Sequence, residues 1–368
     1  MKTLKVPIHK HLGSLSIYQP GRPIEEVARE LNIPFSQVVK MASNENPLGP
    51  SANAIKAMEE AIHKVHLYPD GSAYYLKKNL SERLNIAPES LIFSNGSNEL
   101  IEWIGHLFFD GESNVVVSQY CFAIYPIVAS MFGASTRTIP AVNHAHDLES
   151  MASAIDSKTK AVFVANPNNP TGTLASTDEI LSFLNRVPDT VLIVMDEAYF
   201  EFLESPTELL PYIRDASKPN LLLMRTFSKI HGLAGLRIGY GIGHTDLIQS
   251  MEKVRQPFNV NGIAQAGAMA ALKDDEHVER TRATNRVGLG FLQSGFLQLG
   301  LQYVPSYANF VLVRVGDGKR IFESLQGKGV ITRPMNGYQL PEWLRISVGT
   351  QTENKRCLEA LEQALNLK

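Results

Sequence analysis

The chain has 368 residues, of which 44% are hydrophobic and 20% charged, and its formal net charge is −2. This length predicts two domains, and the composition is ordinary for a soluble globular protein. The charge balance provides no basic surface for nucleic acid or anionic membranes, and no stretch reaches the ~20 apolar residues that span a bilayer. The two cysteines are too few for a disulfide framework, and no spacing typical of a metal site occurs. Because the first residues also lack the apolar core of a signal peptide, we expect a cytoplasmic enzyme.

The first part of the chain is rich in turn residues. Residues 1–45 carry several prolines around one amphipathic pattern at 24–31, which predicts an arm with a single helix. The segments 43–50, Ser-Asn-Glu-Asn-Pro-Leu-Gly-Pro, and 67–71, Leu-Tyr-Pro-Asp-Gly, both have turn composition. Between them, Ser51 is a suitable cap for a helix that continues to Ile62. On the residues alone, both turn segments are connectors.

Five short apolar runs predict the strands of a sheet. They end near residues 94, 118, 165, 195 and 224, are each followed by polar or glycine residues, and are separated by helical patterns. This alternation predicts an open, mainly parallel α/β sheet whose functional sites lie beyond the carboxyl ends of the strands. The first run leads through Gly96 into a helix that starts with Ser97 and Asn98, and free N–H groups at such a start bind anions. Serine and asparagine are equally suited to cap an ordinary helix.

The last of these runs leads to an isolated amine. Lys229 follows a buried strand, Thr226 and Ser228 supply hydroxyls beside it, and Arg237 supplies a cation eight residues later. Burial lowers the pKa of a lysine and makes it a nucleophile for carbonyl compounds, while hydroxyls and a guanidinium suit a phosphate. The alternative on composition alone is a solvated surface lysine, because most lysines are exposed.

The carboxyl-terminal part of the chain predicts a second, smaller domain. A long helix at 276 to about 298 precedes short strands and helices that include 310–314 and 330–333. Arg345 lies within an apolar strand, where a charge needs a partner, and its planar fork fits a carboxylate.

The segment 228–240, Ser-Lys-x-x-Gly-Leu-Ala-Gly-Leu-Arg-x-Gly-Tyr, resembles the cofactor-lysine segment of fold-type-I pyridoxal-phosphate aminotransferases, most closely that of histidinol-phosphate aminotransferases. Further motifs in family order cover nearly the whole chain. They are Asn-Glu-Asn-Pro-x-Gly-Pro, Tyr-Pro-Asp, Gly-Ser-Asn, Asn-Pro-Asn-Asn-Pro-Thr-Gly, Asp-Glu-Ala-Tyr and Leu-Arg-Ile-Ser. The resemblance implies an α/β fold with an amino-terminal arm at 1–45, a large domain at 46–275 and a small α+β domain at 276–368. The large domain is expected to hold a mainly parallel seven-stranded sheet sandwiched by helices, and the arm to join the small domain.

The resemblance also implies a role for each matching residue. Lys229 is the Schiff-base lysine for pyridoxal 5′-phosphate, Asp196 pairs with the ring nitrogen, and Asn169 and Tyr199 bond the phenolic oxygen. The cofactor phosphate is expected on Ser97, Asn98, Thr226, Ser228, Arg237 and, from a partner subunit, Tyr68. Phe122 stands where relatives stack a tyrosine on the ring, and nearby Tyr120 leaves that choice open. The residues expected to bind substrate are Tyr18, Asn46, Arg333 and Arg345.

The function implied is amino transfer between glutamate and imidazole acetol phosphate, giving L-histidinol phosphate in histidine biosynthesis. If Tyr68 reaches a partner's cofactor, the enzyme is a homodimer with its sites at the interface. Three alternatives share much of the pattern: an aromatic amino acid aminotransferase, a decarboxylase of the same cofactor class and a non-enzymatic binding protein. Only Tyr18 and Arg333 favour a phosphorylated substrate over an aromatic one.

Overall fold

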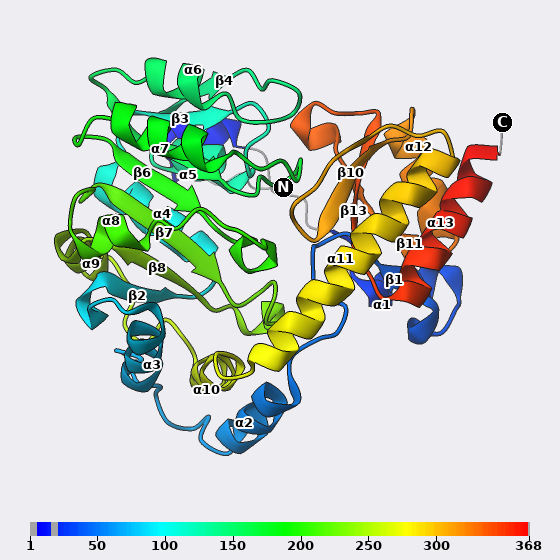
Figure 1. The fold of residues 1–368 in the computed structure, drawn as a ribbon, viewed down its shortest axis with the longest axis horizontal. Coiled ribbons are helices and arrows are strands. Elements are labelled where there is room, and N and C mark those ends of the chain that lie inside the picture. The colour runs from blue at the N-terminus through cyan, green and yellow to red at the C-terminus, as the bar shows by residue number, and fades with distance from the viewer. Residues whose placement is uncertain (1–5, 16–20, 367–368) are drawn as a thin grey trace.

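A seven-stranded sheet lies at the centre of the larger part of the molecule (Figure 1). The computed structural model describes residues 6–15 and 21–366. The strand order is β2-β8-β7-β6-β5-β3-β4, and only β8 runs antiparallel to its neighbours. The strands are β2 (Leu91–Ser94), β3 (Asn114–Ser118), β4 (Ser135–Ile139), β5 (Thr159–Ala165), β6 (Leu192–Asp196), β7 (Leu221–Thr226) and β8 (Gly239–Gly243). The prediction of a mainly parallel sheet of seven strands is therefore confirmed.

The central strands are apolar along their length because helices cover both faces of the sheet. Alternate residues enter two separate cores, so Val162 and Ile193 pack on one face while Phe163 and Val194 pack on the other. The covering helices are α2 (Ala52–Ile62), α3 (Tyr74–Leu84), α4 (Ser97–Phe108), α5 (Ile124–Met131), α6 (Leu148–Ser153), α7 (Thr177–Arg186), α8 (Leu210–Arg214), α9 (Thr245–Glu252) and α10 (Gly262–Ala271). Ser51 caps α2 as expected, because its side chain accepts a hydrogen bond from the Ala54 amide at 3.2 Å.

Strand β8 was not predicted, because three of its five residues are glycine and glycine weakens a strand signal. Its glycines are required by close packing. A Cβ at Gly239 would lie 2.7 Å from the Ser97 amide nitrogen, and one at Gly241 would lie 3.2 Å from the Ile92 side chain. The strand therefore brings the sheet backbone against the start of α4.

A second sheet, of order β12-β13-β10-β9, forms the smaller part of the molecule. Its strands are β9 (Tyr303–Val304), β10 (Phe310–Arg314), β12 (Arg333–Pro334) and β13 (Trp343–Ser347), and α11 (Asp275–Gln298), α12 (Gly318–Gly327) and α13 (Gln351–Asn366) pack with it. Its core is separate from the two cores of the large sheet and includes Leu292, Phe296, Val311 and Leu361. Helix α11 runs from the large part of the molecule to the small part (Figure 1), as predicted for residues 276 to about 298.

The amino-terminal arm crosses to the small sheet. Its helix α1 (Ile24–Leu31) leads to β1 (Val39–Lys40), which pairs in parallel with β11 (Val330–Ile331). Val39 and Met41 enter the core of the small part. These contacts support the division at 45/46 and 275/276, which we retain as our proposal. Within residues 6–15 and 21–366, the short 3₁₀ turns are Lys10–Ser14, Phe35–Gln37, Pro88–Ser90, Phe200–Phe202, Ala234–Leu236 and Asn336–Tyr338. Among the described residues, every helix is too short or too polar to cross a bilayer.

Candidate active site

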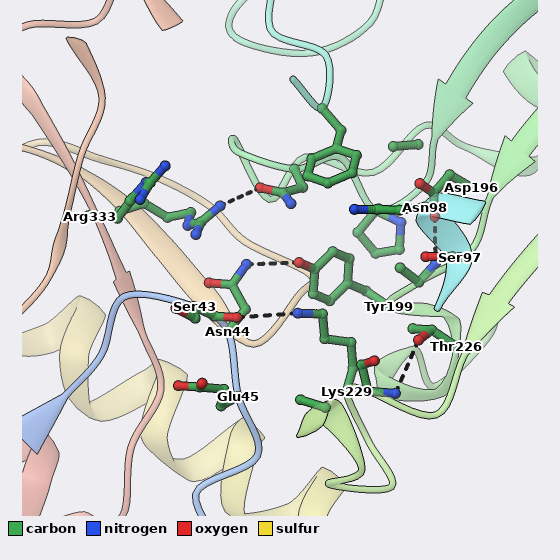
Figure 2. A pocket seen from close by; sticks show the side chains of 18 of the residues that line it. Ser43, Asn44, Glu45, Ser97, Asn98, Asp196, Tyr199, Thr226, Lys229 and Arg333 are labelled. Atoms are coloured by element: carbon green, nitrogen blue, oxygen red, sulfur yellow. Dashed lines mark hydrogen bonds between the residues drawn. The ribbon is translucent and has the colours of Figure 1, made fainter. Parts of the chain in front are cut away.

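A cavity of about 310 Å³ lies where the carboxyl ends of the large-sheet strands face the arm and the small sheet (Figure 2). Its lining comes from segments that are far apart in the sequence. The polar and charged residues that line it are Ser43, Asn44, Glu45, Ser97, Asn98, Asn169, Asp196, Tyr199, Thr226, Ser228, Lys229, Arg237, Arg333, Tyr338 and Arg345, and Phe122 lies among them. The topology therefore gathers most of the residues that the sequence singled out.

Lys229 lies in the turn after β7 and points into the cavity (Figure 2). Its Nζ donates to the Ser43 carbonyl oxygen at 3.2 Å. Burial lowers the pKa of this amine to about 8, and the positive charges of Arg345 and Arg237 act in the same direction. The turn depends on Gly232, whose φ is +70° and whose added Cβ would lie 2.2 Å from the Gly49 carbonyl oxygen. The amine therefore loses its proton at a lower pH than an ordinary lysine does.

The start of α4 forms a cup suited to an anion. Gly96 has φ 78° and ψ 154°, and an added Cβ would lie 2.3 Å from Nη2 of Arg237. This glycine therefore lets the guanidinium approach the first turn of the helix, where free N–H groups and the helix dipole favour negative charge. Ser97 and Asn98 line the cavity there, with Thr226 and Ser228 on the neighbouring β7 end. The cup combines N–H groups, hydroxyls and one cation.

Asp196 ends β6 and is 6% exposed. Its carboxylate accepts a hydrogen bond from the Tyr125 hydroxyl at 2.6 Å and one from the Ala198 amide at 3.1 Å. Burial raises the pKa of Asp196, and the bond from Tyr125 opposes this shift. A carboxylate at this position gives the cavity a fixed acceptor for an N–H group of a bound ring.

Two further pairs complete the wall of the cavity. The Tyr199 hydroxyl accepts a hydrogen bond from Nδ2 of Asn44 at 2.8 Å. Arg345, on β13, donates to Oδ1 of Asn169 at 2.6 Å and to the Ala42 carbonyl oxygen at 2.9 Å. Asn169 belongs to the loop after β5, so this guanidinium joins the small sheet to the large one. Arg345 is 7% exposed and lines the cavity with its positive charge.

Several residues of the prediction lie elsewhere. Asn46 does not line the cavity: its Nδ2 donates to the Ile230 carbonyl oxygen at 2.9 Å and to Thr281 Oγ1 at 3.2 Å, which ties the loop to α11. Tyr68 is 83% exposed and stacks on Phe258 with ring centres 4.9 Å apart. Tyr18 lies outside the described residues.

For the aromatic stacking position, the structure places Phe122 in the cavity wall. Tyr120 instead stacks on His144, with ring centres 5.7 Å apart. The polar lining also includes four residues that the sequence reasoning did not select, Ser43, Asn44, Glu45 and Tyr338. Asn44 shares its motif with Asn46, and nothing in the spacing shows which asparagine faces inward. Tyr338 ends the 3₁₀ turn Asn336–Tyr338, and no local sequence signal marks it as a site residue.

The residues present fit pyridoxal 5′-phosphate. The cup can hold its phosphate, Asp196 its ring nitrogen, and Lys229 its aldehyde carbon. The fit is supported by Gly96 and Gly239, which keep the start of α4 open where any Cβ would fill the space.

Comparisons with known proteins agree with this chemistry. The family model described as aminotransferase class I and II matches residues 36–361. The chain is 46% identical over 358 residues to histidinol-phosphate aminotransferase 2 of Nitrosospira multiformis, covering 96% of this chain and 91% of that protein. It is 47% identical over 352 residues to histidinol-phosphate aminotransferase 1 of Nitrosococcus oceani, covering 95% of each. The solved histidinol-phosphate aminotransferase of Sinorhizobium meliloti, in complex with pyridoxal-5′-phosphate, superposes with a TM-score of 0.88 at 27% identity over 97% of both chains. The chain belongs to the class I and II aminotransferase family.

Proposed function

We propose that this protein is a pyridoxal-phosphate-dependent aminotransferase that exchanges an amino group between L-histidinol phosphate and 2-oxoglutarate in histidine biosynthesis. The observation that carries the proposal is the position of Lys229. Its partly buried amine faces the same cavity as an anion cup, a buried carboxylate and two arginines from the small sheet. The relatives named histidinol-phosphate aminotransferase support the choice of substrate.

The bound cofactor supplies an aldehyde that condenses with amines and a ring that accepts electrons from the substrate's Cα. The cup at the start of α4 would hold its phosphate, and the fixed negative charge of Asp196 would keep its ring nitrogen protonated. Lys229 lies where its amine would hold and move the proton of the substrate's Cα, as general base and then as general acid. Asn169 and Tyr199 hold the phenolic oxygen. These residue roles are part of the proposal.

Two arginines divide the recognition of substrate. Arg345 reaches the cavity from within the small sheet, and its planar fork suits the α-carboxylate of glutamate. Arg333, on the adjacent strand, lines the same cavity and supplies a cation for the phosphate of L-histidinol phosphate. The two cations flank one site, so donor and acceptor substrates bind there in turn.

We also propose a cytoplasmic homodimer. Tyr68 stacks on Phe258 of its own subunit but is still 83% exposed. We expect a second subunit to cover it and to receive its hydroxyl at the partner's cofactor phosphate. The test is to mix Tyr68→Ala subunits with Lys229→Ala subunits. If sites are shared, each mixed dimer keeps one intact site and activity returns. Recovery limited to that of either variant alone contradicts the shared site.

The substrate is tested by steady-state kinetics with 2-oxoglutarate as acceptor. We expect kcat/KM for L-histidinol phosphate to exceed that for phenylalanine, because a phosphate can engage Arg333 by a charge-assisted bond worth roughly 1.5–3 kcal/mol, or about ten- to a hundredfold. Equal or better turnover of phenylalanine would favour the aromatic aminotransferase alternative. Release of carbon dioxide from an amino acid substrate would favour a decarboxylase.

A further inference from the structure

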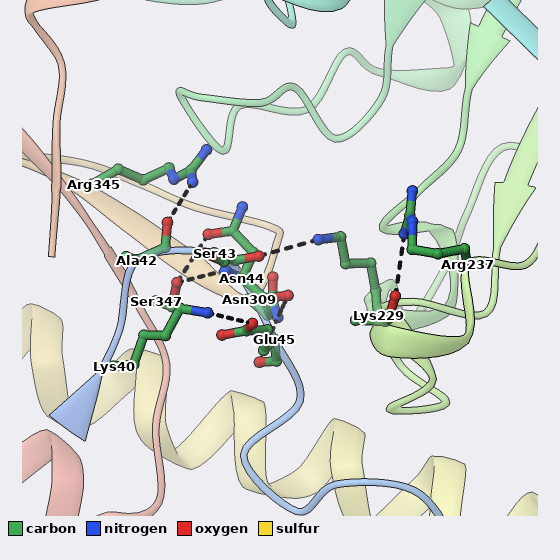
Figure 3. A network of polar contacts seen from close by, with 11 residues as sticks. Lys40, Ala42, Ser43, Asn44, Glu45, Lys229, Arg237, Asn309, Arg345 and Ser347 are labelled. Atoms are coloured by element: carbon green, nitrogen blue, oxygen red, sulfur yellow. Dashed lines mark hydrogen bonds and ion pairs between the residues drawn. The ribbon is translucent and has the colours of Figure 1, made fainter. Parts of the chain in front are cut away.

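The segment 41–45 of the arm is bonded on both sides as it passes between the two sheets (Figure 3). On the side of the small sheet, the Ser347 amide donates to the Met41 carbonyl oxygen at 2.9 Å. On the side of the large sheet, Nζ of Lys229 donates to the Ser43 carbonyl oxygen at 3.2 Å. This short stretch of chain therefore connects β13 directly to a reacting group.

Asn44 makes the densest set of these bonds and is 1% exposed. Its amide N–H donates to Ser347 Oγ at 2.8 Å, and Ser347 Oγ donates to its Oδ1 at 2.9 Å. Asn309 donates to its carbonyl oxygen at 3.0 Å. The remaining group, Nδ2, donates to the Tyr199 hydroxyl at 2.8 Å. Its φ of +55° is a conformation that asparagine adopts more readily than most residues.

The direction of these bonds decides what Tyr199 can do. The Ser347 hydroxyl has one hydrogen and donates it to Oδ1 of Asn44. The other end of the Asn44 amide, Nδ2, therefore faces Tyr199. The Tyr199 oxygen thus accepts from Asn44, and its own hydrogen is available to another acceptor. Tyr199 is 3% exposed and lines the cavity, so that acceptor belongs to the group bound there.

We propose that Asn44 is a positioning residue that fixes Tyr199 as a hydrogen-bond donor into the cavity and links that donor to β13 through Ser347. This inference rests on the proposed role of Tyr199 toward the phenolic oxygen of the cofactor. Through this link, the position of β13 affects the hydrogen bond that Tyr199 donates to the cofactor. The link is separate from the contact between Arg345 and Asn169. It also explains why the sequence places an asparagine at a positive φ inside a buried segment.

Burial keeps Tyr199 protonated in this arrangement. Burial raises the pKa of Tyr199 to about 12, and Arg345 and the bond from Asn44 only partly oppose this shift. Asp196 acts in the same direction as burial, and Nζ of Lys229 lies 5.8 Å from the ring centre. At neutral pH the hydroxyl therefore still carries the hydrogen that it donates.

The test is Asn44→Asp in the holoenzyme, which reverses the polarity of one bond while keeping a residue that adopts positive φ. A carboxylate accepts the Tyr199 hydrogen and withdraws it from the cofactor. The measurement is the pH midpoint at which the visible absorbance of the bound cofactor changes. We expect this midpoint to rise by about one unit or more, the effect of losing one hydrogen bond to a charged oxygen. Ser347→Ala, which releases Oδ1 of Asn44, should raise it by a smaller amount.

Tyr199→Phe separates this inference from the proposed function. If Tyr199→Phe does not raise the midpoint, the role of Tyr199 is wrong and the inference fails with it. If Tyr199→Phe raises the midpoint and Asn44→Asp does not, only the inference fails. In the Tyr199→Phe background we expect the effect of Asn44→Asp to vanish. A shift that persists there would mean that the new charge acts directly, which overturns the role of Asn44. Should Asn44→Asp not fold, as judged by thermal unfolding, an unchanged midpoint in Ser347→Ala overturns it instead.

Discussion

Gly96→Ala tests whether the start of α4 and Arg237 hold the cofactor phosphate. The glycine backbone lies at φ 78° and ψ 154°, a region that other residues occupy at a cost of about 1–3 kcal/mol. The new Cβ would lie 2.3 Å from Nη2 and 2.9 Å from Cζ of Arg237. Because a guanidinium is the far end of a flexible side chain, we expect Arg237 to move out of the cup and the protein to fold with reduced stability.

The consequence is weaker cofactor binding. Removing one charge-assisted hydrogen bond costs roughly 1.5–3 kcal/mol, so the dissociation constant should rise about ten- to a hundredfold. The assay is titration of apoenzyme with pyridoxal 5′-phosphate, followed by absorbance. Gly316→Ala is the matched control, since Gly316 also has a positive φ, +83°, but an added Cβ there meets no atom within 4 Å. The control should lose stability and keep its affinity.

A double variant makes the test of this mechanism sharper. If Gly96→Ala acts by displacing the guanidinium, adding it to Arg237→Ala should weaken binding little further. An unchanged dissociation constant in folded Gly96→Ala, or full additivity in the double variant, would refute the reasoning. Thermal unfolding separates these outcomes from a general loss of structure.

Three further predictions concern the same cavity. Arg345→Lys should lower kcat/KM for glutamate about ten- to a hundredfold while leaving cofactor binding nearly intact, whereas the exposed Arg314→Lys should change neither; a loss confined to cofactor binding would contradict the carboxylate role. In the apoenzyme, Lys229 should react with an acylating reagent at a rate that rises with pH and is half-maximal near pH 8, because only the neutral amine reacts; a midpoint near that of an ordinary lysine would show a solvated amine. Phe122→Ala should weaken cofactor binding about tenfold and Tyr120→Ala less, and the reverse order would move the stacking role to Tyr120.

The sheet could be predicted from the sequence because its parallel strands are buried on both faces. The runs that end at Ser118, Ala165 and Asp196 are apolar throughout and stop at polar or small residues, so their ends were placed within one residue. Strand β7 continued to Thr226, two residues beyond the expected end, because its last residues are polar yet buried. Strand β8 could not be found as an apolar run, because it is rich in glycine. Glycine is required there by the close approach of α4 and is not favoured by strands.

The sequence could predict only those site residues that lie at or just after the ends of the predicted strands. Asp196, Lys229 and Ser97 follow strands of one sheet, so topology alone brings them to one edge. Asn44 and Asn46 are two residues apart in one turn, and which of them faces the cavity depends on Ser347 and Thr281, more than two hundred residues away. Such long-range contacts have no local signature. The contribution of Tyr68 depends on a second chain and therefore remains a prediction.

The central claim is that the amine of Lys229 carries the proton transfer of an aminotransferase acting on L-histidinol phosphate. The most direct measurement is turnover of L-histidinol phosphate with 2-oxoglutarate by wild type, Lys229→Ala and Lys229→Arg, with retained cofactor checked by equilibrium dialysis. The account predicts that both variants still bind the cofactor through the cup and lose at least about a hundredfold in turnover. Turnover by cofactor-loaded Lys229→Ala at a rate near that of wild type would contradict it.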